Sequence, residues 1–329
     1  MSTLAPTLET FFTERLTHQQ QASQHTIAAY RDTFRLLLTF AEQKTGRMPS
    51  SLRLEDLDAP LIGAFLDHLE VDRHNSVRTR NARLAAIHAL FRFAALRHPD
   101  HSALIQRVLS IPQKRGNREL VTFLDRTEID ALLAAPDHTR WVGRRDHALL
   151  LTAVQTGLRV SEITGLTCQD VELGTSAHVQ CRGKGRKDRI TPLAAQTVAV
   201  LRTWLAESRG RPSDPLFPGP RGLALSRDAV ALMVSKYAAA ASERCPSLKT
   251  KTVSPHVLRH TCAMQLLQAG VDTSVIALWL GHESAETTQI YLHADLAIKE
   301  RALARTAPPN TTPGRYRPPD ALLAFLESL

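Results

Sequence analysis

From residue 159 onward, six side chains have the types and settings that phosphate chemistry requires. They are Arg159, Lys184, His256, Arg259, His282 and Tyr291. Two guanidinium groups, an ammonium group and two imidazoles can neutralise a pentacoordinate phosphate, and a tyrosine hydroxyl can attack it as a nucleophile. This set therefore predicts transesterification of a phosphodiester without a metal ion.

The first two of these residues lie beside glycines that can fix their direction. Arg159 follows Thr156-Gly157-Leu158 at a predicted helix break, where a sharp turn can aim its guanidinium. Lys184 stands between Gly183 and Gly185 at the tip of a predicted hairpin, where small neighbours permit close approach to a backbone. Taken alone, each has an ordinary explanation as a surface residue or a turn.

Two of the other four residues lie on a predicted helix, and two come after the end of the next one. His256 and Arg259 are three residues apart in one helix, so both project from the same face. His282 follows a glycine at a helix end, and Tyr291 lies downstream of it. A single histidine or tyrosine in such a place is usually a packing residue, so the prediction depends on the joint chemistry of the set.

Other catalytic patterns are absent from the sequence. There is no GxxxxGK[ST] nucleotide loop and no GxSxG nucleophile elbow. His256 and His260 are four residues apart, but a zinc protease of this kind needs HExxH, and Val257 stands where its glutamate would be. We therefore expect no metal site and no cofactor.

Four segments resemble the motif boxes of the tyrosine recombinase, or phage integrase, family, and they occur in that family's order. They are TGLRVSEITGL (156–166), RGKGRKDRITPL (182–193), SPHVLRHTCAMQLLQAG (254–270) and LGHESAETTQIYLH (280–293). The resemblance is strong over residues 118–300, and the region 10–110 resembles the family's core-binding domain more loosely. It implies an Xer-like, two-domain, site-specific recombinase that cuts and rejoins duplex DNA through a 3′-phosphotyrosine, without ATP.

The resemblance also implies a role for each of the six residues. In chain order, Arg159, Lys184, His256, Arg259, His282 and Tyr291 match the family's first arginine, its lysine, its HxxR histidine and arginine, its histidine-or-tryptophan position and its nucleophile. All six positions agree with the family pattern, so an inactive relative is not expected.

Several biological roles share these residues. The long proline-rich tail favours a mobile-element enzyme for integration and excision over an Xer-type resolvase of chromosome or plasmid dimers. A non-catalytic DNA-binding regulator on the same scaffold and a type IB topoisomerase are further alternatives. The resemblance implies a homotetramer on two double-stranded DNA sites, in which the apolar end of the tail could dock on a neighbouring protomer.

The elements that must position this chemistry are mostly helical. Apolar spacing predicts a small bundle of four amphipathic helices within residues 1–110, which the resemblance identifies as a SAM-like core-binding domain. Further helices are expected beyond it, and Thr127 is a candidate cap for one that starts EIDALLAA. Residues 177–193 predict two short antiparallel strands around a basic turn. The expected fold is thus a helical bundle followed by an α-rich catalytic domain with a small antiparallel β-sheet.

The same patterns divide the chain into four parts. Residues 1–110 are the predicted DNA-binding bundle, and 111–119 form a basic linker. Residues 120–305 are the predicted catalytic domain, and 306–329 form a proline-rich tail with a short C-terminal helix. Two halves joined by a basic linker could close around a duplex.

Basic residues outside the six are candidates for DNA contact. The chain carries 41 Lys and Arg against 32 Asp and Glu, a formal charge of +9, which suits a polyanionic partner. The candidates lie at the start of the fourth helix, in the linker and in the hairpin turn: Arg78, Arg80, Arg83, Lys114, Arg115, Arg186 and Lys187.

Composition restricts the compartment as well. The sequence has no apolar run of 18 residues or more, so no membrane span is expected. Its first residues lack a basic stretch followed by an apolar one, so they are not a secretory signal. The four cysteines form no CxxC pair and are interpreted as reduced thiols of a cytoplasmic protein.

Overall fold

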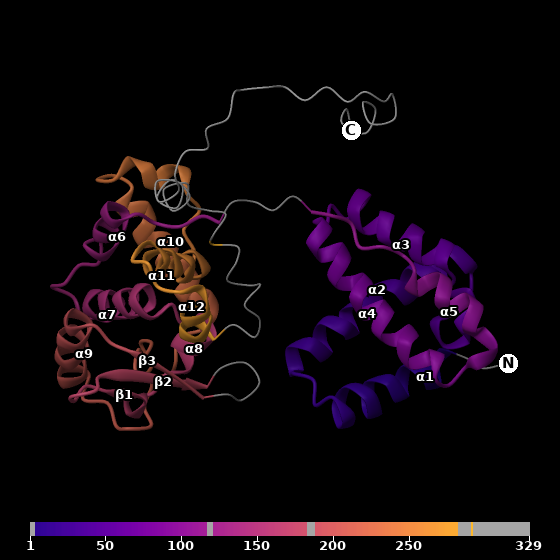
Figure 1. Ribbon diagram of the computed structural model, residues 1–329, viewed down its shortest axis with the longest axis horizontal. Coiled ribbons are helices and arrows are strands. Elements are labelled where there is room, and N and C mark those ends of the chain that lie inside the picture. The colour runs from indigo at the N-terminus through magenta and orange to yellow at the C-terminus, as the bar shows by residue number, and fades with distance from the viewer. Residues whose placement is uncertain (1–3, 117–120, 183–187, 282–290, 292–329) are drawn as a thin grey trace, which may run out of the picture. The chain divides into compact units, whose positions relative to one another are not determined.

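The computed structural model describes residues 4–116, 121–182, 188–281 and Tyr291. The chain divides into two compact units, Met1–Arg118 and Glu119–Leu329, and each has its own hydrophobic core. Within the described ranges, helices predominate and the strands form one small sheet (Figure 1). This is the mostly helical fold that the sequence predicted.

The N-terminal unit is a bundle built around one central helix. Its longer helices are α1 (Leu4–Thr10), the π-helix η1 (Phe11–Gln19), α2 (Gln24–Thr45), α3 (Ala59–Val71), α4 (Val77–Ala95) and α5 (Ser102–Leu109). Short 3₁₀ turns occupy 49–51, 54–56 and 99–101. Helix α4 packs against α2, α3 and α5 (Figure 1), so its apolar side forms the middle of the core.

Side-chain caps set the starts of these helices. Ser23, Asp58 and Ser76 accept hydrogen bonds from backbone N–H groups three residues on, at 2.9–3.2 Å, and such caps each stabilise a helix by about 1 kcal/mol. Helix α5 was not among the four predicted helices. It is short and buries only Ile105 and Val108, so its stability depends on packing against α4.

The segment that leaves the N-terminal unit is held against α4. Arg80 donates from Nη1 to the Pro112 carbonyl at 3.0 Å, and Asn81 exchanges two hydrogen bonds with the Lys114 backbone at 2.8 and 3.1 Å. Lys114 Nζ also pairs with Glu70 at 2.6 Å. We call residues 112–114 the strap; it is packed along α4 within this unit.

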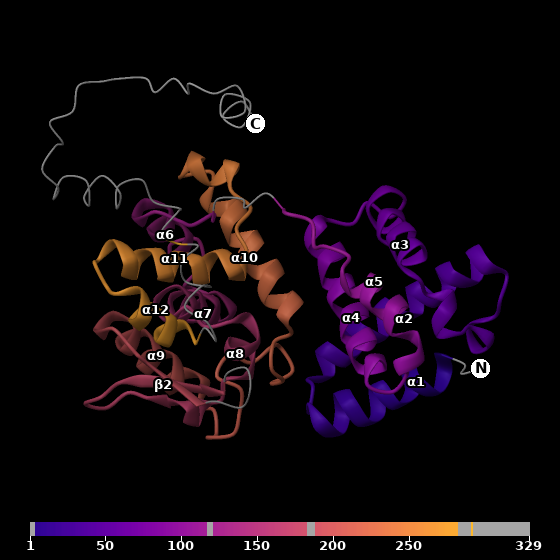
Figure 2. The same ribbon diagram turned by 45° about the vertical axis from the view of Figure 1, so that its right-hand side comes forward.

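The second unit contains the helices α6 (Arg126–Leu133), α7 (Trp141–Thr156), α8 (Val160–Gly165), α9 (Ala195–Ser208), α10 (Arg227–Ala241), α11 (Pro255–Gln268) and α12 (Thr273–Leu280). Short 3₁₀ segments occupy 168–170 and 246–250. Helix α7 passes between α11 and α9 in both views, and the sheet lies at one end of the unit (Figures 1 and 2).

The sheet is antiparallel, as predicted. Strands β2 (His178–Arg182) and β3 (Asp188–Pro192) pair with Val179 opposite Thr191. A two-residue strand, β1 (Val171–Glu172), extends the sheet to the order β1-β2-β3. The hairpin therefore begins and ends close to the predicted limits, and β1 was not expected.

One predicted helix cap was wrong. Helix α6 starts at Arg126, and its cap is Asp125, not Thr127. Asp125 accepts from the Glu128 N–H at 2.9 Å while Glu128 accepts from the Asp125 N–H at 2.8 Å. This reciprocal capping box satisfies two backbone donors at once, which a cap at Thr127 would leave unsatisfied.

Candidate active site

Arg159 is aimed by a sharp break between two helices. Helix α7 ends at Gly157, whose φ of +62° is left-handed, and α8 begins directly after Arg159. The Arg159 guanidinium donates from Nη1 to Glu162 at 2.9 Å and from Nη2 to the Gly281 carbonyl at 2.9 Å. The turn predicted from the sequence thus directs this side chain towards the end of α12.

Arg259 reaches the same place from α11. It is only 3% exposed and donates to the Gly157 carbonyl and to the Leu280 carbonyl, both at 2.6 Å. Burial and, to a lesser extent, the neighbouring charges of Arg159 and Arg189 lower its pKa to about 10, while Glu162 acts in the opposite direction. The protein therefore holds a guanidinium where positive charge is unfavourable until an anion arrives.

Tyr291 lies in a small apolar cluster between α11 and α12. It is 1% exposed and packs with Cys262, Met264 and Leu280. Burial raises its pKa to about 12, although the nearby positive charge of Arg259 acts in the opposite direction. The hydroxyl group is therefore protonated at neutral pH and needs a proton acceptor before it can attack.

A histidine lies at the Tyr291 hydroxyl. His260 Nδ1 and Tyr291 Oη are 3.0 Å apart, and the ring of His256 packs edge-on against the ring of His260, with centroids 4.2 Å apart. His256 is exposed at the start of α11, whereas His260 is half-buried. The helix spacing that was predicted to align His256 with Arg259 therefore also brings His260 to the nucleophile.

Sequence reasoning missed three residues of this cluster: Glu162, Arg189 and His260. A signal existed for Glu162, because it stands three residues after Arg159, in the position of a capping box. His260 was considered only as a zinc ligand, although it follows Arg259 directly. Arg189 gave no local signal, because its contacts are made across the fold.

Four predicted residues lie outside the described residues. They are Lys184, Arg186, Lys187 and His282. The structure therefore brings together Arg159, Arg259 and Tyr291, with His256 next to them through His260.

The candidates for DNA contact in the N-terminal unit fall into two groups. Arg78 and Arg115 are exposed, and Arg83 is half-buried, with no partner for its Nε in the part of the chain that the structure describes. Burial lowers the pKa of Arg83, and the positive charge of Arg73 adds to that effect. Arg80 also holds the strap against α4, and Lys114 pairs with Glu70 of α3.

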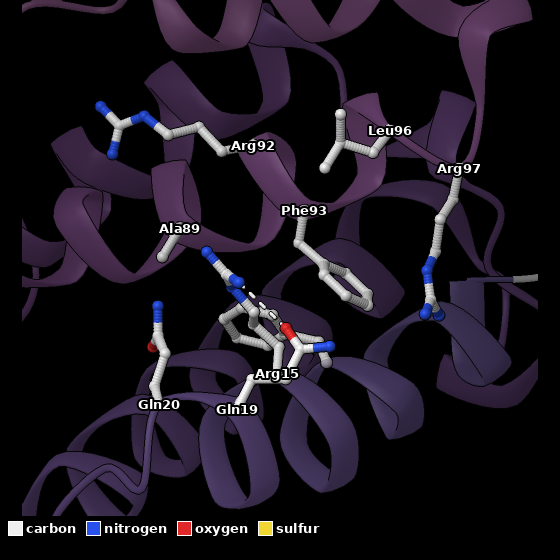
Figure 3. Close-up of a pocket in the computed structure, with 9 residues that line it drawn as sticks. Arg15, Gln19, Gln20, Ala89, Arg92, Phe93, Leu96 and Arg97 are labelled. Carbon is white, nitrogen blue, oxygen red and sulfur yellow. Dashed lines mark hydrogen bonds between the residues drawn. The ribbon is translucent and has the colours of Figure 1, made fainter.

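A separate hollow of about 300 Å³ lies between η1 and α4 (Figure 3). Phe11 and Phe93 contribute its apolar surface, and Arg15, Arg92 and Arg97 stand around it. All of its lining residues belong to the N-terminal unit, so it contains none of the six predicted catalytic residues.

Two absences apply to residues 4–116, 121–182, 188–281 and Tyr291. In those ranges, no three His, Cys, Asp or Glu side chains gather in a way that could hold a metal ion. No helix there is long and apolar enough to cross a lipid bilayer.

Comparison with known proteins gives matches for both units of the chain. Residues 122–297 match the phage integrase family, and residues 10–98 match the phage integrase N-terminal SAM-like domain. The chain is 60% identical over 328 residues to y4rC of Sinorhizobium fredii, a candidate integrase/recombinase by name, covering 100% of this chain and 99% of that protein. It is 33% identical over 315 residues to the tyrosine recombinase XerD of Pseudomonas aeruginosa, covering 94% and 99%.

Solved structures give the same fold. The XerH recombinase bound to its palindromic difH substrate, in a post-cleavage complex, is similar with a TM-score of 0.70 and 25% identity, over 87% of this chain and 81% of that chain. The Tn1549 transposon integrase in complex with circular intermediate DNA is similar in fold, with a TM-score of 0.68 and 17% identity, over 93% and 100%.

Proposed function

The chain belongs to the phage integrase family of tyrosine recombinases, which break and rejoin DNA, and on this premise we propose that Tyr291 is its nucleophile. Tyr291 Oη attacks the scissile phosphate, the bond from phosphorus to the 5′-oxygen breaks, and a 3′-phosphotyrosine forms. The 5′-hydroxyl of another strand then attacks this link and releases the tyrosine. Each step exchanges one phosphate ester for another, so no external energy source is needed.

The observation that carries this proposal is the convergence of Arg159, Arg259 and Tyr291 from three separate segments. The two guanidinium groups, together with His282, bind the non-bridging oxygens as negative charge develops on them. Lys184 protonates the departing 5′-oxygen.

We assign the proton of Tyr291 to His260. Its Nδ1 is within hydrogen-bonding distance of the hydroxyl, and a positioned base of this kind typically contributes about 10²- to 10⁴-fold to a rate. His256, packed against the ring of His260, then serves as a phosphate ligand. Because Tyr291 is buried, the described arrangement corresponds to the protein before it engages DNA.

A covalent adduct is the test of this mechanism. The protein is incubated with a pool of nicked duplexes of randomised sequence, so that cleavage releases the short strand and cannot reverse. Wild type should accumulate a protein–DNA adduct whose sequences reveal the preferred site. Tyr291→Phe should give no adduct while binding the recovered site as tightly as wild type, and an adduct formed by Tyr291→Phe would overturn the assignment.

For the biological role, we propose integration and excision of a mobile element. The name of y4rC includes integrase, and this chain is 60% identical to it over its full length. The identity to XerD is 33%, so the similarity supports integration over the Xer role. Amplification across the two ends of the surrounding DNA segment should detect a circular junction when the protein is expressed. Recombination confined to resolving plasmid dimers would support the Xer role instead.

We further propose that four copies act together on two DNA sites, with Arg78, Arg83 and Arg115 contacting phosphates. The exposure of Arg78 and Arg115, and an Nε of Arg83 that has no partner among the described residues, support this assignment. The mass of the complex trapped by the nicked site should correspond to four protomers and two duplexes. A complex that stays at two protomers on one duplex would contradict the tetramer.

A further inference from the structure

Arg189 is a buried guanidinium in the catalytic cluster that the family motifs leave unassigned. It lies on β3, is 8% exposed, and donates from Nη2 to Glu162 at 2.7 Å. Its Nε and Nη1 atoms are buried and have no hydrogen-bond partner among the residues that the structure describes. Such unmet donors are unfavourable, so a contribution to stability alone does not account for a cation here.

Glu162 connects Arg189 to Arg159. One carboxylate oxygen accepts from Arg159 Nη1 at 2.9 Å, and the other accepts from Arg189 Nη2 at 2.7 Å. The second oxygen also accepts from the backbone N–H of Arg159 at 2.7 Å. The side chain of Glu162 is 4% exposed, so the two arginines hold this carboxylate in a fixed place.

The two arginines also meet at the end of α12. Arg159 Nη2 donates to the Gly281 carbonyl, and Arg189 Nη1 lies 2.8 Å from the point where a Cβ at position 281 would be. Gly281 is therefore held by one guanidinium and packed against the other. These contacts fix the position of Gly281, which is the residue immediately before His282 in the sequence.

We propose that Arg189 is a positioning residue for strand cleavage, acting through Glu162 on Arg159. With Arg189 present, the charge of Glu162 is already balanced, and Arg159 keeps its own positive charge for the scissile phosphate. Without Arg189, Glu162 would pair with Arg159 through both oxygens and draw it away from Gly281. This inference rests on the proposed function, because it assigns Arg159 to the phosphate.

A double-mutant cycle tests the coupling. Rates of adduct formation are measured at saturating DNA for Arg189→Met and Arg189→Lys, each in the wild-type and the Arg159→Lys background. Arg189→Met should lower the rate about 30-fold with wild-type Arg159 but less than about threefold with Arg159→Lys, because the two changes act on one interaction. Arg189→Lys should recover most of the rate, and DNA affinity should change little.

Equal losses in both backgrounds would overturn the inference, since they would show that Arg189 acts independently of Arg159. So would an unchanged rate for folded Arg189→Met. Arg145 provides the matched control, because it is also buried and pairs with Asp146 at 2.7 Å. Arg145→Met should lower stability, while its folded fraction cleaves DNA at close to the wild-type rate.

A crystal structure of Arg189→Met gives a readout that does not depend on activity. We expect Arg159 to leave the Gly281 carbonyl and to pair with both oxygens of Glu162. An unchanged Arg159 would overturn the inference. If wild type formed no adduct, the proposed function would fail, and this structure would still decide whether Arg189 positions Arg159.

Discussion

Arg80 in the N-terminal unit and Arg259 in the catalytic unit are both buried arginines that donate to distant backbone carbonyls. Arg80 is 6% exposed and holds the strap through the Pro112 carbonyl, with Glu70 at 4.0 Å. Arg259 binds two carbonyls but has no carboxylate partner among the described residues. The two residues share burial and differ in the charge around them.

This difference shows what identifies a functional arginine. In the catalytic unit, Arg159 and Arg189 both pair with the carboxylate of Glu162. Burial, and then the charges of these two arginines, lower the pKa of the nearby Arg259 to about 10. In the N-terminal unit, the buried Arg80 instead links two segments of the chain, α4 and the strap. Burial is thus a poor guide to function, whereas an excess of buried like charge indicates an anionic substrate.

The largest expected effect is on catalysis by Arg259→Lys. A lysine cannot donate to both carbonyls while also presenting a planar donor pair to phosphate, so adduct formation should fall about a thousandfold. The free energy of unfolding should change by less than about 2 kcal/mol, because a lysine keeps one hydrogen bond to a carbonyl and, once buried, can lose its proton and with it the repulsion from the neighbouring arginines. Chemical denaturation and adduct kinetics measure the two effects, and a rate within tenfold of wild type would contradict the comparison.

Arg80→Met should show the opposite pattern. Loss of the hydrogen bond to Pro112 and of the charge facing Glu70 should lower the free energy of unfolding by about 1–3 kcal/mol. The strap should become sensitive to trypsin at Lys114 and Arg115. Arg92→Met, at an exposed position of the same helix, is the control, and equal stability of the two variants would show that Arg80 does not hold the strap.

The pH dependence of stability separates Tyr291 from Arg259. The pKa of Tyr291 is raised to about 12, so its stabilising contribution is complete below pH 10 and is lost as the pH rises towards 12. The pKa of Arg259 is lowered to about 10, so its buried charge disfavours the folded state at lower pH. Above pH 10 the folded protein loses this proton before the unfolded chain does, and stability therefore rises with pH.

The Tyr291→Phe variant isolates the first effect. Between pH 9 and 11, wild type should lose about 1 kcal/mol of unfolding free energy relative to Tyr291→Phe. Urea denaturation of both proteins at each pH measures this difference. A difference that does not vary with pH would show that Tyr291 is not held in a protonated, buried state.

The smallest effect is expected at exposed cations. Arg78→Ala removes one proposed phosphate contact, so the slope of log affinity against log salt should become shallower by about 0.9. Lys114→Ala should change the slope less, because Lys114 is paired with Glu70. Anisotropy titrations over a range of salt concentrations measure both, and equal slopes for Arg78→Ala and wild type would remove Arg78 from the DNA interface.

Features encoded by short segments could be predicted from the sequence. Ser76 and Ser254 start α4 and α11, and Gly157 and Gly281 end α7 and α12 with left-handed conformations. The β2–β3 hairpin was predicted from its strands and its glycines. These signals depend only on neighbouring residues, so the sequence predicted the helix break before Arg159 and the start of the helix that carries Arg259.

Features that depend on tertiary contacts could not be predicted. Along β3, Arg189 is buried while Ile190 is 61% exposed, the reverse of the usual strand alternation. Arg189 lies inside because Glu162, on another element, compensates its charge. Asp125, in place of Thr127, is a smaller case: two candidate caps compete, and the reciprocal bond to Glu128 decides between them.

Gly281 restricts how relatives of this protein can diverge. Its φ of +64° disfavours any side chain, and an added Cβ would collide with Arg189. A lineage that replaces Gly281 would therefore strain the backbone and displace the Arg189 guanidinium at the same time. Shortening Arg189 would relieve only the second of these effects, so we expect descendants that keep the reaction to keep the glycine.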